Sequence, residues 1–314
     1  MSVIRVLAPG LFTTVQDLGR PGFGSLGVSA SGAADPIALR LGNRLVGNPE
    51  GAAALEMTLL GGTFEFPEGA VIALGGSDFG AALGNAQVLP WLSLDVSPGQ
   101  TLTLGPTRSG ARCYLCVRGG IAVKPFLGSA STHLLSGLGG VEGRPLRKGD
   151  VLETGGIPGA AFRKRALVAE AQERLVPRKR LRVTRGPQYD AFAEVSRHAF
   201  YAHIYRVAEE SNPMGLRLEG PPLLAESSGE MITEGVSLGA VQVPPGGRPI
   251  ILFVEQQTTG GYPKIANVIA ADLPSLGQLR PRDEVQFEPV TIDEARAVLA
   301  EQEHWLASLE LMEP

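Results

Sequence analysis

The sequence is poor in the residues that usually mark covalent scaffolds and metal sites. Among its 314 residues are two cysteines and four histidines, and aromatic residues account for 6%. Two cysteines cannot build a disulfide framework. The histidines are scattered and show no metal-ligand spacing, so no metal site is expected. A P-loop, an H-E-x-x-H pair and a G-x-S-x-G elbow are also missing, which excludes the standard forms of these three sites.

The two cysteines, Cys113 and Cys116, have the spacing of a redox pair. They lie in an apolar stretch that is typical of a β-strand, however. Residues three apart on a strand face opposite sides. The spacing therefore predicts two separately buried thiols.

Long apolar runs and concentrated charge are scarce as well. No stretch of about 18 apolar residues occurs, and the first residues do not resemble a signal peptide, so a cytoplasmic protein without a membrane span is expected. The formal net charge is −4. Basic residues gather only at 163–165 and 178–182, without interleaved aromatic residues, which favours a solvated linker over a nucleic-acid surface.

Glycine and proline are abundant, with 41 and 24 residues. This composition is typical of many short strands joined by tight turns, and it predicts a mainly β protein. A length of 314 residues suits two domains.

Similar segments recur at an offset of about 177 residues, which predicts a duplicated β-rich domain. The boundary is predicted near residue 170, giving domains 1–170 and 171–314. The aligned segments are 35–41 with 212–218, 62–69 with 239–246, the apolar runs 71–74 and 250–254, and 99–104 with 282–287.

Two helices have clear local signals. Asp35 and Pro36 form an N-cap and first-position pair, and Ile37, Leu41 and Leu45 then share one face. At the other end of the chain, residues 291–294 form a capping box before an apolar stripe that is expected to pack on the second domain.

The most informative segment is 257–263, Gln-Thr-Thr-Gly-Gly-Tyr-Pro, which follows the apolar run 250–254. Amides and hydroxyls both donate and accept hydrogen bonds, so they suit a neutral planar N–C=O group. The two glycines allow the backbone to approach a ligand. A polar hairpin turn is the plainer alternative. Similar clusters surround Asp17, Arg20, Glu234 and Gln242.

These clusters, in this order, resemble the carboxyltransferase-domain family. Its members include the C subunit of 5-oxoprolinase, the carboxyltransferase part of urea amidolyase, and Kip-type antagonists of a sporulation-kinase inhibitor. The resemblance runs from Phe12 to about Phe287, and residues 257–263 are its most specific part. It implies two tandem cyclophilin-like β-barrel domains with few peripheral helices. It also implies two partners that resemble the B and A subunits of 5-oxoprolinase, and ATP-dependent opening of 5-oxoproline to L-glutamate.

The sequence departs from the family pattern at three places. Glu255 stands where an aspartate is usual, and Asn212 with Pro213 replaces an aspartate–arginine pair. Arg282 replaces a turn glycine. The missing arginine at position 213 weakens any transfer of an anion-binding role to that segment.

The resulting hypothesis is a site for the lactam of 5-oxoproline, active only with the partner subunits. Glu255, Gln257 and Asp17 are the predicted catalytic residues, with Glu255 or Asp17 as base. Arg217 is expected to hold the substrate carboxylate. The other predicted substrate-binding residues are Gln242, Thr258, Thr259, Gly260, Gly261, Tyr262, Arg20 and Glu234.

Two other functions stay open. A biotin-dependent carboxyltransferase acting on urea-like amides would need a biotin carrier in trans, because the chain has no Met-Lys dipeptide, so biotin on this chain is not expected. A regulatory protein that antagonises a kinase inhibitor would use the same partner surface without catalysis. The position of the ATP site and the subunit stoichiometry do not follow from the sequence.

Overall fold

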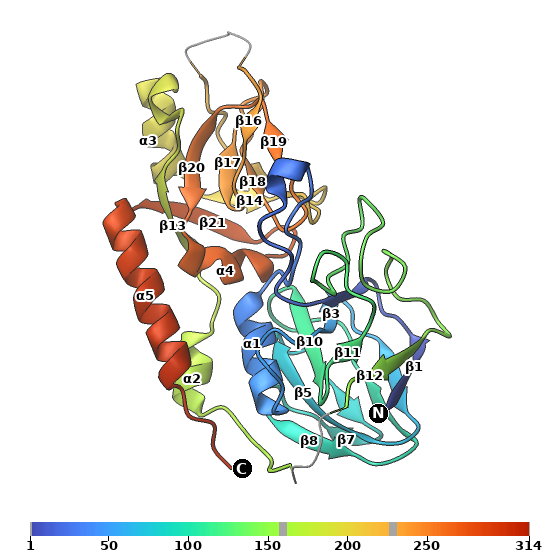
Figure 1. Cartoon of the computed structure of the whole chain (residues 1–314). Helices are drawn as coiled ribbons and strands as arrows, with labels where there is room; N and C mark the ends of the chain where they lie inside the picture. Colours follow the sequence, from blue (N-terminus) through green and yellow to red (C-terminus); the bar gives the residue numbers. More distant parts are fainter. Residues whose placement is uncertain (1, 157–161, 226–230, 314) are drawn as a thin grey trace. The chain divides into compact units, whose positions relative to one another are not determined.

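The computed structural model describes residues 2–156, 162–225 and 231–313. These residues form two units. The first comprises Met1–Arg20, Ser31–Val176 and Glu310–Pro314, and the second comprises Pro21–Ala30 and Pro177–Leu309 (Figure 1). The main division thus follows Val176 instead of residue 170, and two short segments belong to the unit that is distant in sequence.

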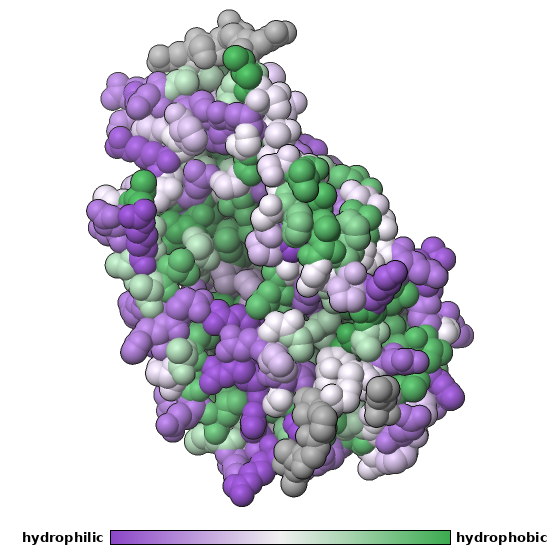
Figure 2. All heavy atoms as spheres, in the orientation of Figure 1, coloured by the Kyte–Doolittle hydropathy of each residue, from purple (hydrophilic) through white to green (hydrophobic). Residues whose placement is uncertain are grey.

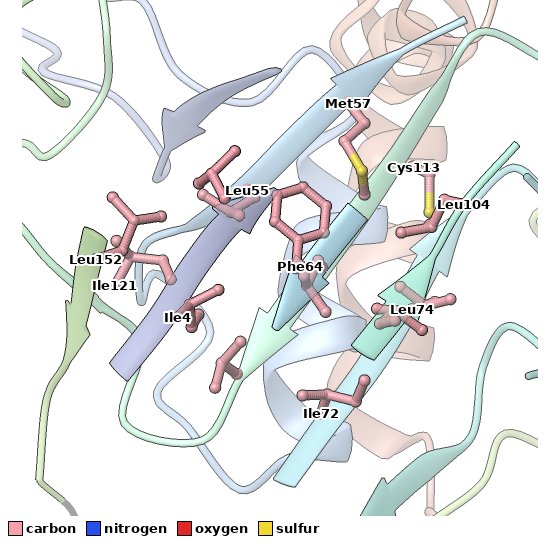
Figure 3. Packing of buried hydrophobic residues seen from close by; sticks show 14 of the residues in the cluster. Ile4, Leu55, Met57, Phe64, Ile72, Leu74, Leu104, Cys113, Ile121 and Leu152 are labelled. Carbon is pink, nitrogen blue, oxygen red and sulfur yellow. The ribbon is translucent and has the colours of Figure 1, made fainter. Parts of the chain in front are cut away.

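In the first unit the strands form two sheets around one core. The seven-stranded sheet has the order β11-β12-β1-β4-β9-β6-β7, with β1 (Val3–Ala8), β4 (Thr63–Phe66), β6 (Ala82–Leu83), β7 (Ala86–Gln87), β9 (Gln100–Thr103), β11 (Ile121–Ala122) and β12 (Val151–Thr154). The five-stranded sheet has the order β2-β3-β10-β5-β8, with β2 (Thr13–Gln16), β3 (Ala54–Thr58), β5 (Ala70–Gly76), β8 (Ser93–Val96) and β10 (Arg112–Val117). Figure 3 shows side chains from both sheets meeting in the core, among them Phe64, Leu55 and Leu74.

Helix α1 (Pro36–Leu45) confirms the first predicted helix, and α2 (Ala169–Arg174) is the second helix of this unit. The Asp35 side chain accepts a hydrogen bond from the Ala38 backbone N–H over 3.0 Å, as an N-cap does. A Cβ at Gly42 would overlap Sγ of Cys116, so the glycine allows α1 to lie close against β10.

The two cysteines lie on β10 as predicted, free and buried on opposite faces. Cys113 belongs to the core between the sheets, whereas Cys116 faces α1. Burial raises the pKa of both thiols well above the ordinary value.

In the second unit seven strands close into a barrel with the order β13-β20-β17-β18-β15-β14-β21. They are β13 (Arg180–Arg185), β14 (Tyr205–Val207), β15 (Gly215–Glu219), β17 (Ala240–Gln242), β18 (Ile250–Leu252), β20 (Lys264–Val268) and β21 (Glu284–Pro289). β13 and β21, which pair in parallel, close the ring. The mainly β prediction is confirmed, with a closed barrel in this unit.

A small sheet and the remaining helices complete the second unit. The strands β16 (Glu234–Gly235) and β19 (Thr259–Gly260) pair with each other. The helices are α3 (Glu194–Ala202), α4 (Leu273–Gly277) and α5 (Ile292–Ser308), with the 3-10 turns η1 (Gly24–Leu26), η2 (Tyr189–Ala191) and η3 (Ala270–Asp272). Figure 1 shows α3 beside the barrel strands, where Phe200 stacks on Phe287 at a centroid distance of 4.3 Å. No helix in the described ranges is long and apolar enough to cross a membrane.

The C-terminal helix α5 has the predicted capping box at Thr291 and Glu294. Its apolar stripe is half-buried, with Leu306 fully buried, and α5 contacts η3 and β13 of the same unit. The prediction that it packs on the second domain is confirmed.

The proposed repeat is wrong for its first pair of segments, 35–41 and 212–218. The first forms the start of α1, whereas the second leads into the strand β15. In the second segment the Asn212 side chain accepts from the Met214 backbone N–H over 2.9 Å, two residues ahead, which makes a turn instead of a helix cap. The segments after it also differ in pairing: β17 and β18 are neighbours, whereas β4 and β5 belong to different sheets.

Candidate functional site

Residues 257–263, the most informative segment of the sequence, follow the strand β18 and contain the strand β19 of the small sheet. Thr259 and Gly260 form β19, whose residues pair with Gly235 and Glu234 of β16. The Val236 backbone N–H also donates to the Thr258 carbonyl over 3.1 Å. The structure therefore brings together two polar clusters that are well separated in the chain.

A pocket of about 700 Å³ lies at this small sheet, within the second unit. Thr258 and Thr259 supply two of its hydroxyls. The other lining residues are Gly24, Ser25, Gly27, Pro187, Gly235, Val236, Ser237, Lys264 and Asn267. Hydroxyls, one amide and one ammonium are the polar groups, and among the lining residues Lys264 is the charged one.

One side of the pocket comes from a segment that the sequence did not predict for it. Residues 21–30, which we call the strap, belong to the second unit although they precede α1 in the chain. Gly27 has a φ of 79°, which favours glycine. The Ser29 hydroxyl fixes the strap by donating to the Val254 carbonyl over 3.2 Å. Figure 2 shows hydrophobic surface over the strap, where Leu26 is 74% exposed.

The pocket lysine was also missed. Lys264 starts β20 and its side chain is buried, in an ion pair with the Glu234 carboxylate. The Gln188 side chain joins both residues: its Nε2 donates to Glu234 Oε1 over 2.8 Å, and its Oε1 accepts from the Lys264 backbone N–H over 3.1 Å. These side-chain hydrogen bonds, first that from Lys264, lower the pKa of Glu234. The available signal was a lysine at the head of the segment 265–269, which is apolar except for Asn267, directly after the Gln-Thr-Thr-Gly-Gly-Tyr-Pro segment.

The two predicted glutamines lie behind the lining residues. The Gln257 amide Nε2 donates to Gln242 Oε1 over 3.4 Å, and Gln242 is 2% exposed. Gly260 packs against them, since a Cβ there would overlap the Gln242 amide nitrogen. That nitrogen has no hydrogen-bond partner among the residues that the structure describes. The side chains of Gln242 and Gln257 thus lie behind β19, with Gly260 packed against Gln242.

The remaining residues predicted in this region lie outside the lining of the pocket. Glu255 is buried at 5% exposure, and its backbone N–H donates to the Pro213 carbonyl over 2.8 Å. Tyr262 is 44% exposed. Gly261 is half-buried between Gly260 and Tyr262.

Arg217 does not join this pocket, contrary to the hypothesis that it holds a carboxylate beside the glutamines. It lies exposed on β15, where β-strand alternation turns Leu216 and Leu218 inward. It lines a separate pocket of about 600 Å³, together with Asn212 and Arg248.

Asp17 and Arg20 belong to the first unit. The Asp17 carboxylate accepts hydrogen bonds from the Gly19 and Ala130 backbone N–H groups and from the Ser129 and Ser131 hydroxyls, at 2.6–2.8 Å. The structure therefore uses its oxygens to hold the chain at residues 129–131.

The Arg20 guanidinium is 1% exposed and serves the same part of the first unit. It donates to the carbonyls of Phe126 and Ser131 and to the Ser31 hydroxyl. Buried donors that are already bonded leave little capacity for a substrate. The geometry gives Arg20 a positioning role for the loop.

The arrangement in the second unit suits a small polar molecule. Neutral donors and acceptors surround a single ammonium, so a ligand with one planar amide and one anionic group matches its chemistry. Within the described residues, no group of three or more His, Cys, Asp or Glu side chains is placed to hold a metal ion.

The comparison with protein families agrees with the motifs. The family described as carboxyltransferase domain, subdomain A and B, matches residues 26–289.

The chain belongs to the carboxyltransferase-domain family.

Two relatives within this family match the chain nearly end to end. The 5-oxoprolinase C subunit of Escherichia coli is 39% identical over 98% of this chain and 97% of its own length. The protein of the same name from Haemophilus influenzae is 37% identical over 93% of both chains. Among solved structures, the urea amidolyase of Kluyveromyces lactis superposes with a TM-score of 0.91 at 34% identity, over 98% of this chain and 20% of that protein.

One departure from the carboxyltransferase-domain pattern has a visible backbone consequence. Arg282, at the position of a usual turn glycine, has a φ of 73°. The backbone at this residue lies in the left-handed region although the residue has a side chain.

Proposed function

We propose that this chain is the C subunit of a 5-oxoprolinase complex, which opens 5-oxoproline to L-glutamate with ATP. The observation that carries the proposal is the match to two proteins that bear this name, which covers 97% and 93% of their lengths and 98% and 93% of this chain. The urea amidolyase of Saccharomyces cerevisiae, in contrast, is matched over only 18% of its length.

The pocket at β16 and β19 supports a lactam as the substrate. A lactam presents one N–H donor and one carbonyl acceptor in a plane. The hydroxyls of Ser237, Thr258 and Thr259 donate and accept, and so match both groups. Gly235 lines the pocket and has no atom within 4 Å of where a Cβ would lie, so a flat ring could approach the backbone there.

Among the described residues that line the pocket, Lys264 is the one that can transfer a proton, and it is paired with Glu234. Ring opening needs a proton donor for the leaving nitrogen and a way to activate the carbonyl. Partners that resemble the B and A subunits of 5-oxoprolinase would complete the site and would contribute to the use of ATP. This explains why the isolated chain is expected to be inactive.

The test is reconstitution. The purified chain alone should release no glutamate from 5-oxoproline, and it should do so with ATP after addition of the A-type and B-type partner proteins of the same host. Omission of each protein in turn, or of ATP, is the control. A complete complex that assembles and yields no glutamate contradicts the proposal.

A second candidate is biotin-dependent carboxyl transfer to a urea-like amide. The TM-score of 0.91 to the urea amidolyase of Kluyveromyces lactis favours it, since the match spans 98% of this chain. The biotin would have to come from a carrier protein, because the chain has no Met-Lys dipeptide. Capture on avidin of a native complex that contains this chain would support this function over the first.

A further inference from the structure

The Lys264 side chain has an unusual position for a lysine. It is 4% exposed, it lines the pocket, and its counter-ion is Glu234. A lysine ammonium has three N–H donors. Beyond the ion pair with Glu234, no hydrogen-bond acceptor reaches Nζ among the described residues. Leaving donors of a buried charge unsatisfied is costly, so the geometry calls for a further acceptor in the pocket.

The counter-ion is held differently from the lysine. The Glu234 side chain is 44% exposed and lies on β16, a two-residue strand that pairs with β19 and stands outside the barrel order. Lys264 and Gln188 both bond to the same carboxylate oxygen, Oε1. Glu234 can therefore leave the lysine and remain hydrated, whereas Lys264 is fixed by the barrel strand β20.

A purely structural ion pair would not need this asymmetry. Of the residues that line the pocket, Lys264 is the charged one, and the polar groups around it are the neutral side chains of Ser25, Ser237, Thr258, Thr259 and Asn267. The pocket is thus neutral while Glu234 is paired with Lys264, and it becomes cationic when Glu234 swings away.

We propose that Lys264 binds the carboxylate of the small molecule that enters this pocket, and that Glu234 is an internal counter-ion which this carboxylate displaces. The inference rests on the proposed function for the identity of the ligand: 5-oxoproline carries one carboxylate on its lactam ring. Lys264 takes the role that the sequence suggested for Arg217, and Gln188 receives Glu234 when the lysine is released.

Three matched probes test the inference by calorimetry on the full chain. 5-Oxoproline has the lactam and the carboxylate, 2-pyrrolidinone has only the lactam, and cyclopentanecarboxylate has only the carboxylate. Loss of one charge-assisted hydrogen bond weakens binding by about 10- to 100-fold. Lys264→Met should weaken both carboxylates by about this factor and leave 2-pyrrolidinone unchanged. Glu234→Gln should tighten both carboxylates, because the competitor is gone.

Two control variants test whether the effect is specific to the positive charge at position 264. Arg206→Met removes an exposed cation of the same unit, on β14, and should change none of the three affinities. Lys264→Arg keeps a cation, and it should retain the preference for carboxylates even if Lys264→Met does not fold. Circular dichroism and a thermal melt establish that each variant is folded.

The outcomes separate this inference from the proposed function. Carboxylates that bind Lys264→Met as tightly as the wild type overturn the inference, and so does a Glu234→Gln variant that loses carboxylate binding. A wild-type chain that binds neither carboxylate also overturns it. If cyclopentanecarboxylate binds through Lys264 as tightly as 5-oxoproline, the carboxylate site stands, whereas lactam recognition and the proposed function fail.

Discussion

Gln257 donates its side-chain amide to the side-chain oxygen of Gln242, behind the strand that carries Thr259 and Gly260. Gly260 of β19 packs against the Gln242 amide, and Thr259 of the same strand lines the pocket. If a hydrogen bond of the transition state depends on this strand, Gln257→Ala should lower kcat of the reconstituted complex by about 10² or more. The measurement is ATP-dependent glutamate release.

A matched control for this variant is Gln302→Ala on α5, whose amide donates to the Ala271 carbonyl away from the pocket. It should leave turnover unchanged. Equal turnover of the wild type and Gln257→Ala would remove Gln257 from the mechanism.

Gly260→Ala tests the packing of the same strand. A Cβ at this position would overlap the Gln242 amide nitrogen and crowd the Val236 side chain. Overpacking of this kind destabilises a protein by about 1–3 kcal/mol. Urea denaturation should show the loss, and Gly246→Ala, where no atom lies within 4 Å of the new Cβ, should not. Equal stability of the two variants would contradict the described contact.

Arg282→Gly should stabilise the protein. A left-handed backbone costs a residue with a side chain about 1–2 kcal/mol, and the greater freedom of glycine in the unfolded chain offsets part of the gain. The side chain contributes an exposed ion pair with Glu209, which is worth little. A net gain of about 0.5–1 kcal/mol is expected from urea denaturation. Arg282→Ala, which keeps the strain, should show no gain; a stability order with alanine above glycine would refute this explanation.

The pair of Arg144 and Asp150 should make stability depend on pH. The carboxylate accepts from Arg144 at 2.8 and 3.0 Å and from the Arg147 backbone N–H at 2.7 Å, and these bonds lower its pKa below the ordinary value of 3.8. Because the folded-state pKa is lowered, the stabilisation is complete above pH 3.8 and is lost as the pH falls towards the folded-state pKa.

Asp150→Asn should therefore cost about 1–3 kcal/mol near pH 7, and the difference from the wild type should shrink below about pH 4. Denaturant titrations at several pH values measure it. Asp293→Asn, at an almost fully exposed side chain, is the control. A difference that is independent of pH would show that the carboxylate charge is not the cause.

Local signals explain what the sequence could predict. The cap residues of α1 and α5, Asp35 and Thr291, lie within three residues of the backbone N–H groups they bond. The start of each helix can therefore be predicted from the local sequence. The opposite faces of Cys113 and Cys116 follow from strand periodicity alone.

The failed alignment of 35–41 with 212–218 shows the limit of such signals. Both segments begin with a side-chain acceptor and a proline, followed by spaced apolar residues. The difference is whether that acceptor bonds three residues ahead, as Asp35 does, or two, as Asn212 does. This choice depends on what the next apolar residues pack against, which the local pattern does not contain.

The site needed three-dimensional information for the same reason. The sequence predicts Thr258 and Thr259 because they lie within one motif, and Glu234 because its cluster resembles the others. The sequence around Lys264 is that of an ordinary strand, and only the folded barrel shows that Lys264 lines the pocket. The strap is separated from its unit by about 150 residues, and no periodicity connects them.

The strap also has a consequence for how the protein is made. During synthesis, residues 21–30 leave the ribosome long before residues 177–309 are made. The first unit can therefore fold before the strap has the rest of the second unit to pack against. A gene split at the obvious midpoint would produce a C-terminal product whose candidate pocket lacks Gly24, Ser25 and Gly27 from its lining. Laboratories that express the halves separately should append the early peptide to the late one.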